Sequence, residues 1–427
     1  MARRSASPGA RLGAVTRPAR RAGIEKIRAY PGSLVLDIQK LGAVRGHDPI
    51  ELHDTMMIDE RSINPTWEDP ITMAVNAAKP MLTDADREAI ELLIVGTESA
   101  PDQEKAASTW VHRYLGLKPS CRNFEVKHAC YSGTAALQMA LAWIASGLSG
   151  AAKALVITTD QSRMHLGQPY EFVMGASSAA ILVSTDPRLL EVEVDKCGYW
   201  TEEVSDLTRP TSRVEQGDAE TSLLAYLDAL DGAYVHYVER VGEAIDFDTY
   251  FIKNVYHAPF GGMTFRAHKA MLRKWKPLSK SEAWAHFERK TLASLRYVRR
   301  MGGTYASSPL IGLMGLVDGS EDLRPGDRVS LYSYGSGCCA EFYSGLIGPA
   351  AREVVRAARL SDLLDERHTV GVEEYEAVER ERTRYIDCGE YQPGLDGLEG
   401  WYDRHYRGKG YLVFCGMRDH YRRYAWS

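Results

Sequence analysis

Short apolar runs that alternate with helix-like segments constrain the fold of this chain more than any other feature. Glu91–Val95, Ala154–Thr159 and Ala179–Val183 are each five or six residues long and mostly apolar. Runs of this kind are typical of strands that are buried on both faces. Between the first two runs lie a helix-like segment at Asp102–Gly116 and, at 128–148, a strand end, a tight turn and a helix. This alternation predicts an α/β fold.

The same pattern extends over the remaining sequence. Further strands are predicted at Ser33–Gln39, Asn123–Val126, Ile252–Tyr256 and Arg328–Tyr334, and helical segments at Asp69–Met81, 219–246, 263–302 and about 359–386. Strand-to-glycine-turn junctions occur in both halves, which favours two halves of like topology. At roughly 150 residues per domain, the 427 residues suit two or three domains or one large two-halved fold.

Composition excludes several classes of protein. Hydrophobic residues make up 44% and charged residues 26%, which excludes wholesale disorder. No stretch approaches the roughly 18 apolar residues that span a bilayer, so we expect a soluble protein with no membrane contact. The seven cysteines include no CxxC pair, so neither a zinc site nor a disulfide framework is predicted. A reducing compartment, the cytoplasm, fits best.

Charge is distributed unevenly along the chain. Residues 1–22 hold six arginines and no acid, whereas the remaining 46 basic and 57 acidic residues give a net charge of −11. The basic leader shares some composition with a transit peptide, but a disordered extension or an over-extended start site is the preferred interpretation. Within the acidic body, Arg266–Arg300 contains eleven Lys and Arg and only two acids. A solvated helical face explains such a run, and nucleic-acid binding is disfavoured because no recognition motif accompanies it.

Cys130 lies in the sequence HACYSGTAA, where a strand is expected to end in a tight turn and open a helix. The positive end of that helix would stabilise a thiolate and lower the pKa of the thiol. The alternative is an ordinary buried cysteine. Cys338 and Cys339 lack this setting and are expected to be core residues.

Two further polar residues follow predicted strands. His257 ends the strand 252–256 and is followed by Pro259 and a glycine pair, and Glu98 follows the strand Glu91–Val95. An imidazole at a strand end can bind a substrate carbonyl, and a carboxylate can act as general base and acid. Taken alone, a structural histidine is the favoured interpretation of His257, and a helix-capping or solvated glutamate that of Glu98. The turn Gly335-Ser336-Gly337 after the strand Arg328–Tyr334 offers backbone N–H groups for an oxyanion.

Taken together, these motifs resemble the 3-hydroxy-3-methylglutaryl-CoA (HMG-CoA) synthase family of the thiolase superfamily. The matching pieces are AGIEKIRAY at 22–30, TESA at 97–100, HACYSGTAAL at 128–137, NVYHAPFGGM at 254–263 and LYSYGSGCCAEFYSG at 331–345. The resemblance implies a thiolase-like fold of two similar βαβαβαββ halves, at 23–190 and 191–427, that form a layered αβαβα core.

The resemblance also assigns roles to residues. Cys130 would be the acetylated nucleophile, Glu98 the general acid and base, and His257 the group that binds the acceptor's β-carbonyl. Ser336 and Gly337 would hold the thioester oxygen, and Tyr305 and Gly303 would contact the substrate. The chain departs from the family at two positions. Gly262 stands where many members carry a CoA-binding lysine, and Gly303 stands in place of an asparagine that helps to hold the acceptor.

The PFGGM form is closest to the polyketide branch of the family, which installs β-branches on carrier-bound chains. The expected partners are therefore donor and acceptor acyl carrier proteins, and Arg266, Lys269, Arg273 and Lys274 are the predicted docking residues. No permanently bound cofactor or metal is expected; the substrates are phosphopantetheine thioesters of carrier protein or CoA. A homodimer is expected from the resemblance.

Three other functions remain open at the level of sequence. The first is a CoA-dependent HMG-CoA synthase of isoprenoid metabolism. The second is a condensing enzyme similar to ketoacyl synthase III, against which Glu98 argues. The third is a catalytically weakened partner or scaffold protein of a synthase assembly, which Gly303 motivates.

Overall fold

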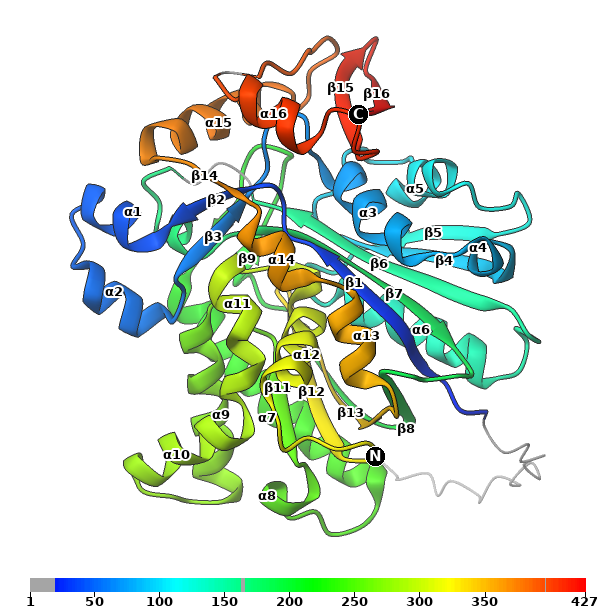
Figure 1. Ribbon diagram of the computed structural model, residues 1–427. Helices are drawn as coiled ribbons and strands as arrows, with labels where there is room; N and C mark the ends of the chain where they lie inside the picture. The colour runs from blue at the N-terminus through cyan, green and yellow to red at the C-terminus, as the bar shows by residue number, and fades with distance from the viewer. Residues whose placement is uncertain (1–19, 163–165, 396) are drawn as a thin grey trace, which may run out of the picture.

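A nine-stranded mixed sheet runs through the molecule (Figure 1), in the order β11-β12-β13-β8-β1-β7-β6-β4-β5. The structure is a computed structural model and describes residues 20–162, 166–395 and 397–427. The strands are β1 Gly23–Tyr30, β4 Ile90–Gly96, β5 Arg122–Val126, β6 Lys153–Gln161, β7 Ala176–Ser184, β8 Leu190–Thr201, β11 Lys253–Tyr256, β12 Arg328–Gly335 and β13 Cys339–Ile347. The strands predicted at 91–95, 123–126, 154–159, 179–183, 252–256 and 328–334 all belong to this sheet, which confirms the α/β class.

Strand pairing repeats in the two halves. In the first half β4 runs parallel to β6, β6 antiparallel to β7, and β7 antiparallel to β1. In the second half β11 runs parallel to β12, β12 antiparallel to β13, and β13 antiparallel to β8. The halves join where β1 pairs with the first residues of β8, Gly23 with Glu191 and Ile24 with Leu190. The division into units at 23–190 and 191–427 stays a prediction.

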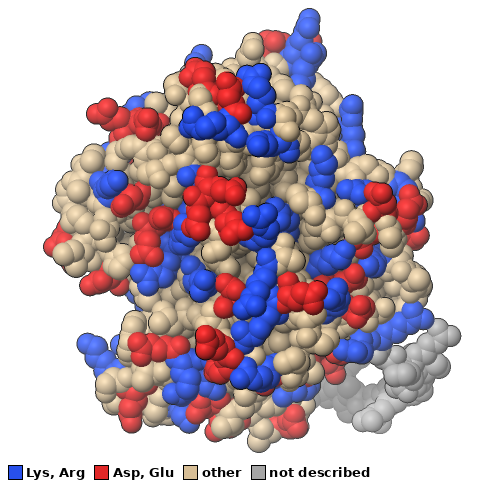
Figure 2. Space-filling model, in the orientation of Figure 1, with Lys and Arg blue, Asp and Glu red and all other residues tan. Residues whose placement is uncertain are grey.

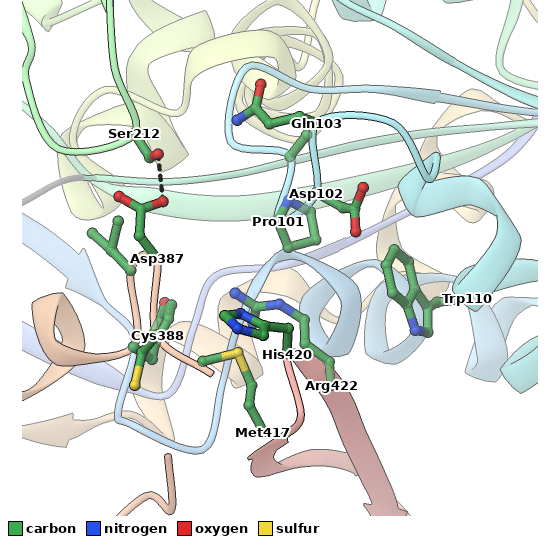
Figure 3. A pocket seen from close by; sticks show the side chains of 13 residues that line it. Pro101, Asp102, Gln103, Trp110, Ser212, Asp387, Cys388, Met417, His420 and Arg422 are labelled. Carbon is green, nitrogen blue, oxygen red and sulfur yellow. Dashed lines mark hydrogen bonds between the residues drawn. The ribbon is translucent and has the colours of Figure 1, made fainter. Parts of the chain in front are cut away.

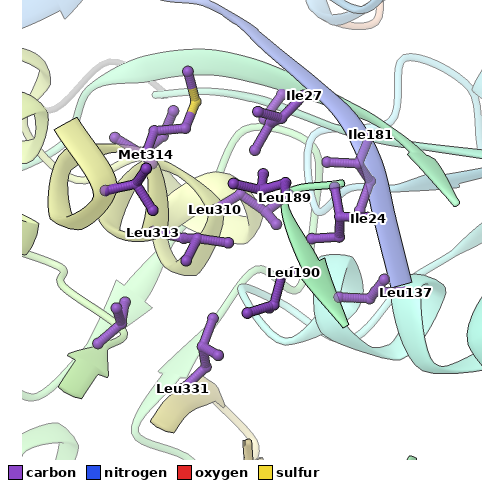
Figure 4. Packing of buried hydrophobic residues seen from close by; sticks show 14 of the residues in the cluster. Ile24, Ile27, Leu137, Ile181, Leu189, Leu190, Leu310, Leu313, Met314 and Leu331 are labelled. Atoms are coloured by element: carbon purple, nitrogen blue, oxygen red, sulfur yellow. The ribbon is translucent and has the colours of Figure 1, made fainter. Parts of the chain in front are cut away.

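Helices cover the sheet in layers. Helices α6 (Ser132–Ala145) and α12 (Ser308–Gly319) pack against inward residues of both halves in one core (Figure 4). Helices α3 (Pro70–Ala78) and α5 (Ala107–Leu115) cover the outer face of the first half, and α7 (Ala219–Val241) and α9 (Gly261–Trp275) that of the second. Side chains alternate along β4 accordingly: Ile94 faces the inner core, and Leu93 and Val95 the outer one. The layers are therefore α, β, α, β and α, as predicted.

Several predicted boundaries differ from the structure because a local signal ends the element. The strand predicted at Ser33–Gln39 is β2 (Leu34–Asp37) only, since Asp37 accepts hydrogen bonds from Gln39 and Lys40 and so begins helix α1 (Ile38–Val44). The helical region 263–302 consists of α9, α10 (Lys280–Lys290) and α11 (Leu295–Met301). The break before α10 follows from Ser279, which forms a capping box with Glu282.

The C-terminal segment packs on the first half of the chain. Helices α15 (Val372–Arg384) and α16 (Glu399–His405) and the hairpin of β15 (Leu412–Arg418) and β16 (Tyr421–Trp426) lie at the top of Figure 1, beside α3 and β2. Strand β14 (His368–Thr369) pairs with β2, and the Asn76 side chain bonds to the backbone of Leu412. Residues distant in sequence therefore support α3.

Most of the predicted basic leader, residues 1–19, lies outside the described residues. Residues 20–22 belong to the folded body, because Arg21 pairs with Glu191 and Ala22 is buried in the inner core. Among the described helices, none is both long enough and apolar enough to cross a membrane.

Candidate active site

Cys130 and Glu98 meet where two neighbouring parallel strands end. Glu98 follows β4, and Cys130 follows β5 in the turn that opens α6. The turn is tight: Ala129 has a φ of 43°, and the N–H of Tyr131 donates to the carbonyl of His128 at 3.1 Å. The Cys130 thiol donates to Glu98 Oε2 at 3.3 Å. The predicted strand–turn–helix setting of Cys130 is present, and it delivers the thiol directly to a carboxylate.

The pKa of Cys130 shifts in the direction opposite to the sequence-based prediction. Burial raises the pKa of the thiol well above its ordinary value, and the carboxyl groups of Glu98 and Asp160 raise it further. The prediction rested on the field of the α6 N-terminus alone and left out this burial and these two carboxyl groups. The resting residue is therefore a neutral thiol that donates a hydrogen bond to the Glu98 carboxylate.

Asp160 is a buried part of the site that the sequence analysis missed. It lies near the end of β6, and its Oδ1 accepts from the Glu98 N–H at 2.9 Å and from the Thr97 hydroxyl at 3.0 Å. Burial, and then the neighbouring Glu98, raise the pKa of Asp160 to about 8. The signal that could have found it is its position, since β6 runs parallel to β4 and ends at the same edge of the sheet.

His257 reaches the same site from the second half. It follows β11, its N–H donates to the carbonyl of Tyr332 at 2.7 Å, and its carbonyl accepts from the Tyr226 hydroxyl at 2.7 Å. Burial lowers the pKa of the imidazole to about 3, so the ring is neutral at neutral pH. The buried Nδ1 has no hydrogen-bond partner among the described residues. A neutral, buried imidazole on a hydrogen-bonded backbone suits hydrogen bonding to a ligand better than carrying a charge.

Gly303 and Tyr305 form another wall of the site. Tyr305 is buried with a φ of 48°, and its hydroxyl has no partner among the described residues. At Gly303 a Cβ atom would lie 2.7 Å from the carbonyl oxygen of Pro259 and 2.9 Å from that of Val173. The chain therefore has no room for the family's asparagine side chain at this position.

Ser336 and Gly337 of the glycine turn after β12 were the predicted oxyanion residues, and one of them lines the cavity. Ser336 lines the same cavity as Cys130 and His257. The N–H of Gly337 instead donates to Asp206 Oδ1 at 2.8 Å, and Asp206 also accepts from the Tyr334 hydroxyl at 2.7 Å. Because its N–H already has an acceptor, Gly337 is not available as the oxyanion donor that the sequence predicted, and its role is to fix the turn.

A cavity of about 300 Å³ lies beside Cys130 and His257. Cys130, His257, Gly303, Tyr305 and Ser336 line it, together with mostly apolar side chains. Arg266, which is exposed on α9, lies at its rim. The cavity can therefore admit an extended thioester and bring its carbonyl carbon to the thiol of Cys130.

The basic stretch Arg266–Arg300 is less positive in the structure than its composition predicts. Seven of its eleven cations pair with acids from other segments: Lys274, Lys276, Arg289, Lys290, Arg296, Arg299 and Arg300. Figure 2 likewise shows basic and acidic side chains interspersed over this face of the molecule. Arg266, Lys269 and Arg273 are exposed and have no ion-pair partner among the described residues. Lys274 differs, because its Nζ lies 2.6 Å from Asp231.

Comparison with known proteins gives a consistent result. A family model for the C-terminal part of hydroxymethylglutaryl-coenzyme A synthase matches residues 267–425. The polyketide biosynthesis 3-hydroxy-3-methylglutaryl-ACP synthase PksG of Bacillus subtilis is 38% identical over 368 residues, which cover 83% of this chain and 87% of that protein. The hydroxymethylglutaryl-CoA synthase of Enterococcus faecalis is 34% identical over 358 residues, 83% of this chain and 91% of that protein.

Solved structures agree in fold. The HMG synthase of the curacin biosynthetic pathway superimposes with a TM-score of 0.90 at 37% identity, over 96% of this chain and all of that one, and it has also been solved in complex with a donor acyl carrier protein. The B. subtilis PksG structure gives a TM-score of 0.90 at 35% identity, over 95% of this chain and 99% of that one. The shared architecture is the thiolase-like fold. With its fold, its site and these relatives, the chain belongs to the hydroxymethylglutaryl-CoA synthase family of acyl-condensing enzymes.

Proposed function

We propose that this enzyme transfers an acetyl group from an acyl carrier protein to Cys130 and condenses it with a β-ketoacyl thioester on a second carrier protein. Hydrolysis then releases an HMG-type product, as in polyketide β-branching. The observation that carries the proposal is that Cys130 and His257 line one apolar cavity, with the thiol of Cys130 3.3 Å from the carboxylate of Glu98.

The first half-reaction uses the neutral thiol of Cys130. Glu98 accepts the thiol proton as Sγ attacks the acetyl carbonyl, and the tetrahedral oxyanion collapses with loss of the pantetheine thiolate. The proton on Glu98 returns to that leaving thiolate. The sum of the step is one thioester exchanged for another. Backbone N–H groups near Cys130 and Ser336 are the proposed donors to the oxyanion.

The second half-reaction forms the carbon–carbon bond. Glu98 removes a proton from the methyl group of acetyl-Cys130, and the resulting enolate attacks the β-carbonyl of the acceptor. The neutral imidazole of His257 donates a hydrogen bond to that carbonyl oxygen, and Glu98 returns its proton to the alkoxide that forms. Water then hydrolyses the thioester at Cys130, which frees a carboxylate and restores the thiol.

Two structural features favour a carrier protein over CoA. A Cβ atom at Gly262 would lie 2.1 Å from the carbonyl oxygen of Thr55, so no lysine fits where other family members bind CoA. Arg266, Lys269 and Arg273, spaced by three and four residues, share one face of α9 that begins at the cavity rim. Carrier proteins are acidic, and an exposed basic face next to the cavity would orient one.

Intact-mass spectrometry tests the reaction. Incubation with acetyl-carrier protein should add one acetyl group to the wild-type chain and none to Cys130→Ala, and later addition of β-ketoacyl-carrier protein should yield the HMG-type product. Cys388→Ala is the matched control and should still be acetylated, because Cys388 lies outside this cavity. Faster reaction with acetyl-CoA and acetoacetyl-CoA than with the carrier proteins would favour the CoA-dependent alternative. Absence of acetylation would favour the weakened partner protein.

Charge reversal tests the docking face. Arg273→Glu should weaken carrier binding, and added salt should reduce the difference from wild type. Arg356→Glu makes the same change of charge at an exposed residue of α13 (Ala351–Ala357), away from α9, and should leave affinity unchanged. Equal affinities for both variants would contradict docking on α9.

We also propose a homodimer in the cytoplasm. The dimer rests on the family resemblance, and the compartment on seven cysteines that are all free thiols. Sedimentation equilibrium would give the mass of the assembly, and a monomer at micromolar concentration would contradict the dimer.

A further inference from the structure

A short hairpin from the second half lies over Glu98. Strands β9 (Leu207–Thr208) and β10 (Gln216–Gly217) pair with each other. The segment 207–217, which comprises both strands and the loop between them, is here called the flap. Arg209 of the flap reaches Glu98 twice. Its Nη1 donates to the Glu98 carbonyl oxygen at 2.5 Å, and its Nη2 lies 3.4 Å from Glu98 Oε1. One guanidinium therefore contacts both the backbone and the carboxylate of this residue.

A second carboxylate fixes the orientation of Arg209. The Nε of Arg209 donates to Glu215 Oε2 at 2.9 Å, and Nη2 contacts the same oxygen. Both side chains are largely removed from solvent, with 15% of the Arg209 side chain and 5% of the Glu215 side chain exposed. A planar guanidinium held at two of its donors by one partner has few rotamers left. Its remaining donors are thus aimed at Glu98 before any substrate arrives.

The charges around Glu98 explain why such a contact matters. The Glu98 N–H donates to Asp160, and the Cys130 thiol donates to the Glu98 carboxylate. Glu215 contacts Arg209, and the charges of Glu98 and Arg209 both affect the pKa of Tyr305. Among the described residues, Arg209 contacts the Glu98 carboxylate directly, with its Nη2 3.4 Å from Oε1. A nearby cation favours the charged form of a carboxylate, whereas the neighbouring carboxyl groups of Asp160 and Glu215 oppose it.

We infer that Arg209 is a positioning residue that holds the Glu98 carboxylate against Cys130 and compensates its charge, with Glu215 orienting the guanidinium. The inference deepens the proposed function, because it rests on Glu98 as the base of the reaction. It assigns a role to the flap, which carries no residue of the proposed catalytic set.

The outer side of the flap provides a matched control. Ser212 donates to Asp387 Oδ1 at 2.6 Å, and Arg213 contacts Asp387 and the carbonyl of Ile386. Ser212, Ile386 and Asp387 line a second cavity of about 250 Å³ between the flap, the loop after Glu98 and the C-terminal hairpin, and Figure 3 shows the Ser212–Asp387 bond there. Arg213 and Asp387 form an exposed ion pair, with 55% and 53% of their side chains accessible, that contributes little to holding the flap, and among the described residues Arg213 makes no contact with Glu98. Arg213→Gln removes the same charge as Arg209→Gln from the same segment.

The test measures the rate of product formation from pre-acetylated enzyme against pH. Arg209→Gln should slow this step at least tenfold at neutral pH and move the acid-side midpoint of the profile upward by about one pH unit, the effect of losing an adjacent cation. Arg209→Lys keeps the charge and should restore the midpoint but only part of the rate. Glu215→Gln should slow the step without the upward movement. Arg213→Gln should behave as wild type.

A second readout needs no substrate. Loss of the cation disfavours the Cys130 thiolate, so alkylation of Cys130 by iodoacetamide at pH 8 should slow about tenfold in Arg209→Gln and stay unchanged in Arg213→Gln. Wild-type alkylation rates in Arg209→Gln, or equal slowing in both variants, would overturn the inference. A wild-type enzyme that makes no product, yet shows the expected alkylation pattern, would count against the proposed function and leave the role of Arg209 supported.

Discussion

At the scale of single residues, burial decides the protonation states at the site. It raises the pKa of the Cys130 thiol, raises that of Asp160 to about 8 and lowers that of His257 to about 3. At neutral pH the Cys130 thiol is thus protonated and the histidine uncharged. As the proposed nucleophile, a thiol in this state needs a base within hydrogen-bond distance, and Glu98 is the base that we propose.

Substitution of Glu98 by glutamine tests this division of roles. Glu98→Gln removes the base that takes the methyl proton of acetyl-Cys130, so condensation should slow by about 10²–10⁴-fold. Product formation from pre-acetylated enzyme measures the loss. Glu91→Gln in the same strand is the control, since Glu91 is exposed and pairs with Lys118 on the surface. Condensation at the wild-type rate in Glu98→Gln would remove Glu98 from the mechanism.

Gly303 gives a prediction about stability. The carbonyl oxygens of Pro259 and Val173 leave no room for a Cβ atom, so Gly303→Ala should destabilise the fold by about 1–3 kcal/mol, as overpacking does elsewhere. Urea unfolding measures the difference. Gly371→Ala is the control: its φ is −72°, and the nearest atom to its Cβ is a flexible carboxylate oxygen at 3.6 Å. Equal stabilities of the two variants would show that the backbone around Gly303 adapts.

The sequence predicted Cys130, Glu98 and His257 because each follows a predicted strand and lies in a motif that resembles the same family. It did not predict Asp160 or Arg209. Asp160 was within reach of the same reasoning, since it lies near the end of a predicted strand. Arg209 was not, because its contact with Glu98 joins residues 111 positions apart through a hairpin with two-residue strands. Nothing in the local sequence indicates that contact.

At the scale of elements, the apolar runs predicted strands well and the mixed sequences did not. Strand β8 lies in an acidic stretch and was not predicted, although Leu190 and Val192 are buried and alternate with half-buried glutamates. Strand β13 was not predicted either, because it follows directly after a glycine turn. Both strands pair with neighbours on each side, so backbone hydrogen bonds within the sheet stabilise them despite polar side chains.

The start of α3 gives a prediction at this scale. Asp69 caps the helix, and its Oδ2 accepts from Arg422 at 2.9 Å and from the Tyr424 hydroxyl at 2.7 Å. Asp69→Asn leaves the buried Arg422 without a counter-charge and should cost about 3–5 kcal/mol of unfolding free energy. Thermal and urea unfolding measure it. Asp84→Asn, at the exposed start of α4 (Asp84–Ala89), should cost under about 1 kcal/mol.

At the scale of the whole molecule, the last part of the chain stabilises the first. The pair of Asp69 with Arg422, the bonds of Asn76 to Leu412 and the contact of Tyr406 with Glu68 all join residues more than 330 positions apart. The sequence predicted the doubled fold from its strand junctions. It did not predict that the C-terminal segment returns to α3, because charged helices and a Tyr- and Arg-rich end give no sign of their partner.

Glu68 makes this long-range contact dependent on pH. Its carboxyl group is buried, accepts hydrogen bonds from the hydroxyls of Tyr30 and Tyr406, and has its pKa raised by burial from 4.5 to about 7. Between these two values the folded chain keeps a proton that the unfolded chain has lost. The stabilisation from Glu68 is therefore complete below pH 4.5, falls by up to about 1.4 kcal/mol per pH unit, and is lost above pH 7.

Comparison with Glu68→Gln isolates this contribution. Buried neutral histidines such as His257 and His268, with pKa values lowered to about 3, give the opposite slope, but they are present in both proteins and cancel in the difference. The advantage of wild type over Glu68→Gln should therefore shrink as the pH rises from 5 to 7 and level off above 8, measured by urea unfolding at fixed ionic strength. Glu239→Gln, an exposed residue of α7, should show no such trend. A pH-independent difference for Glu68→Gln would mean that Glu68 stays ionised in the fold, with its charge balanced entirely by the tyrosine hydroxyls of the two ends of the chain.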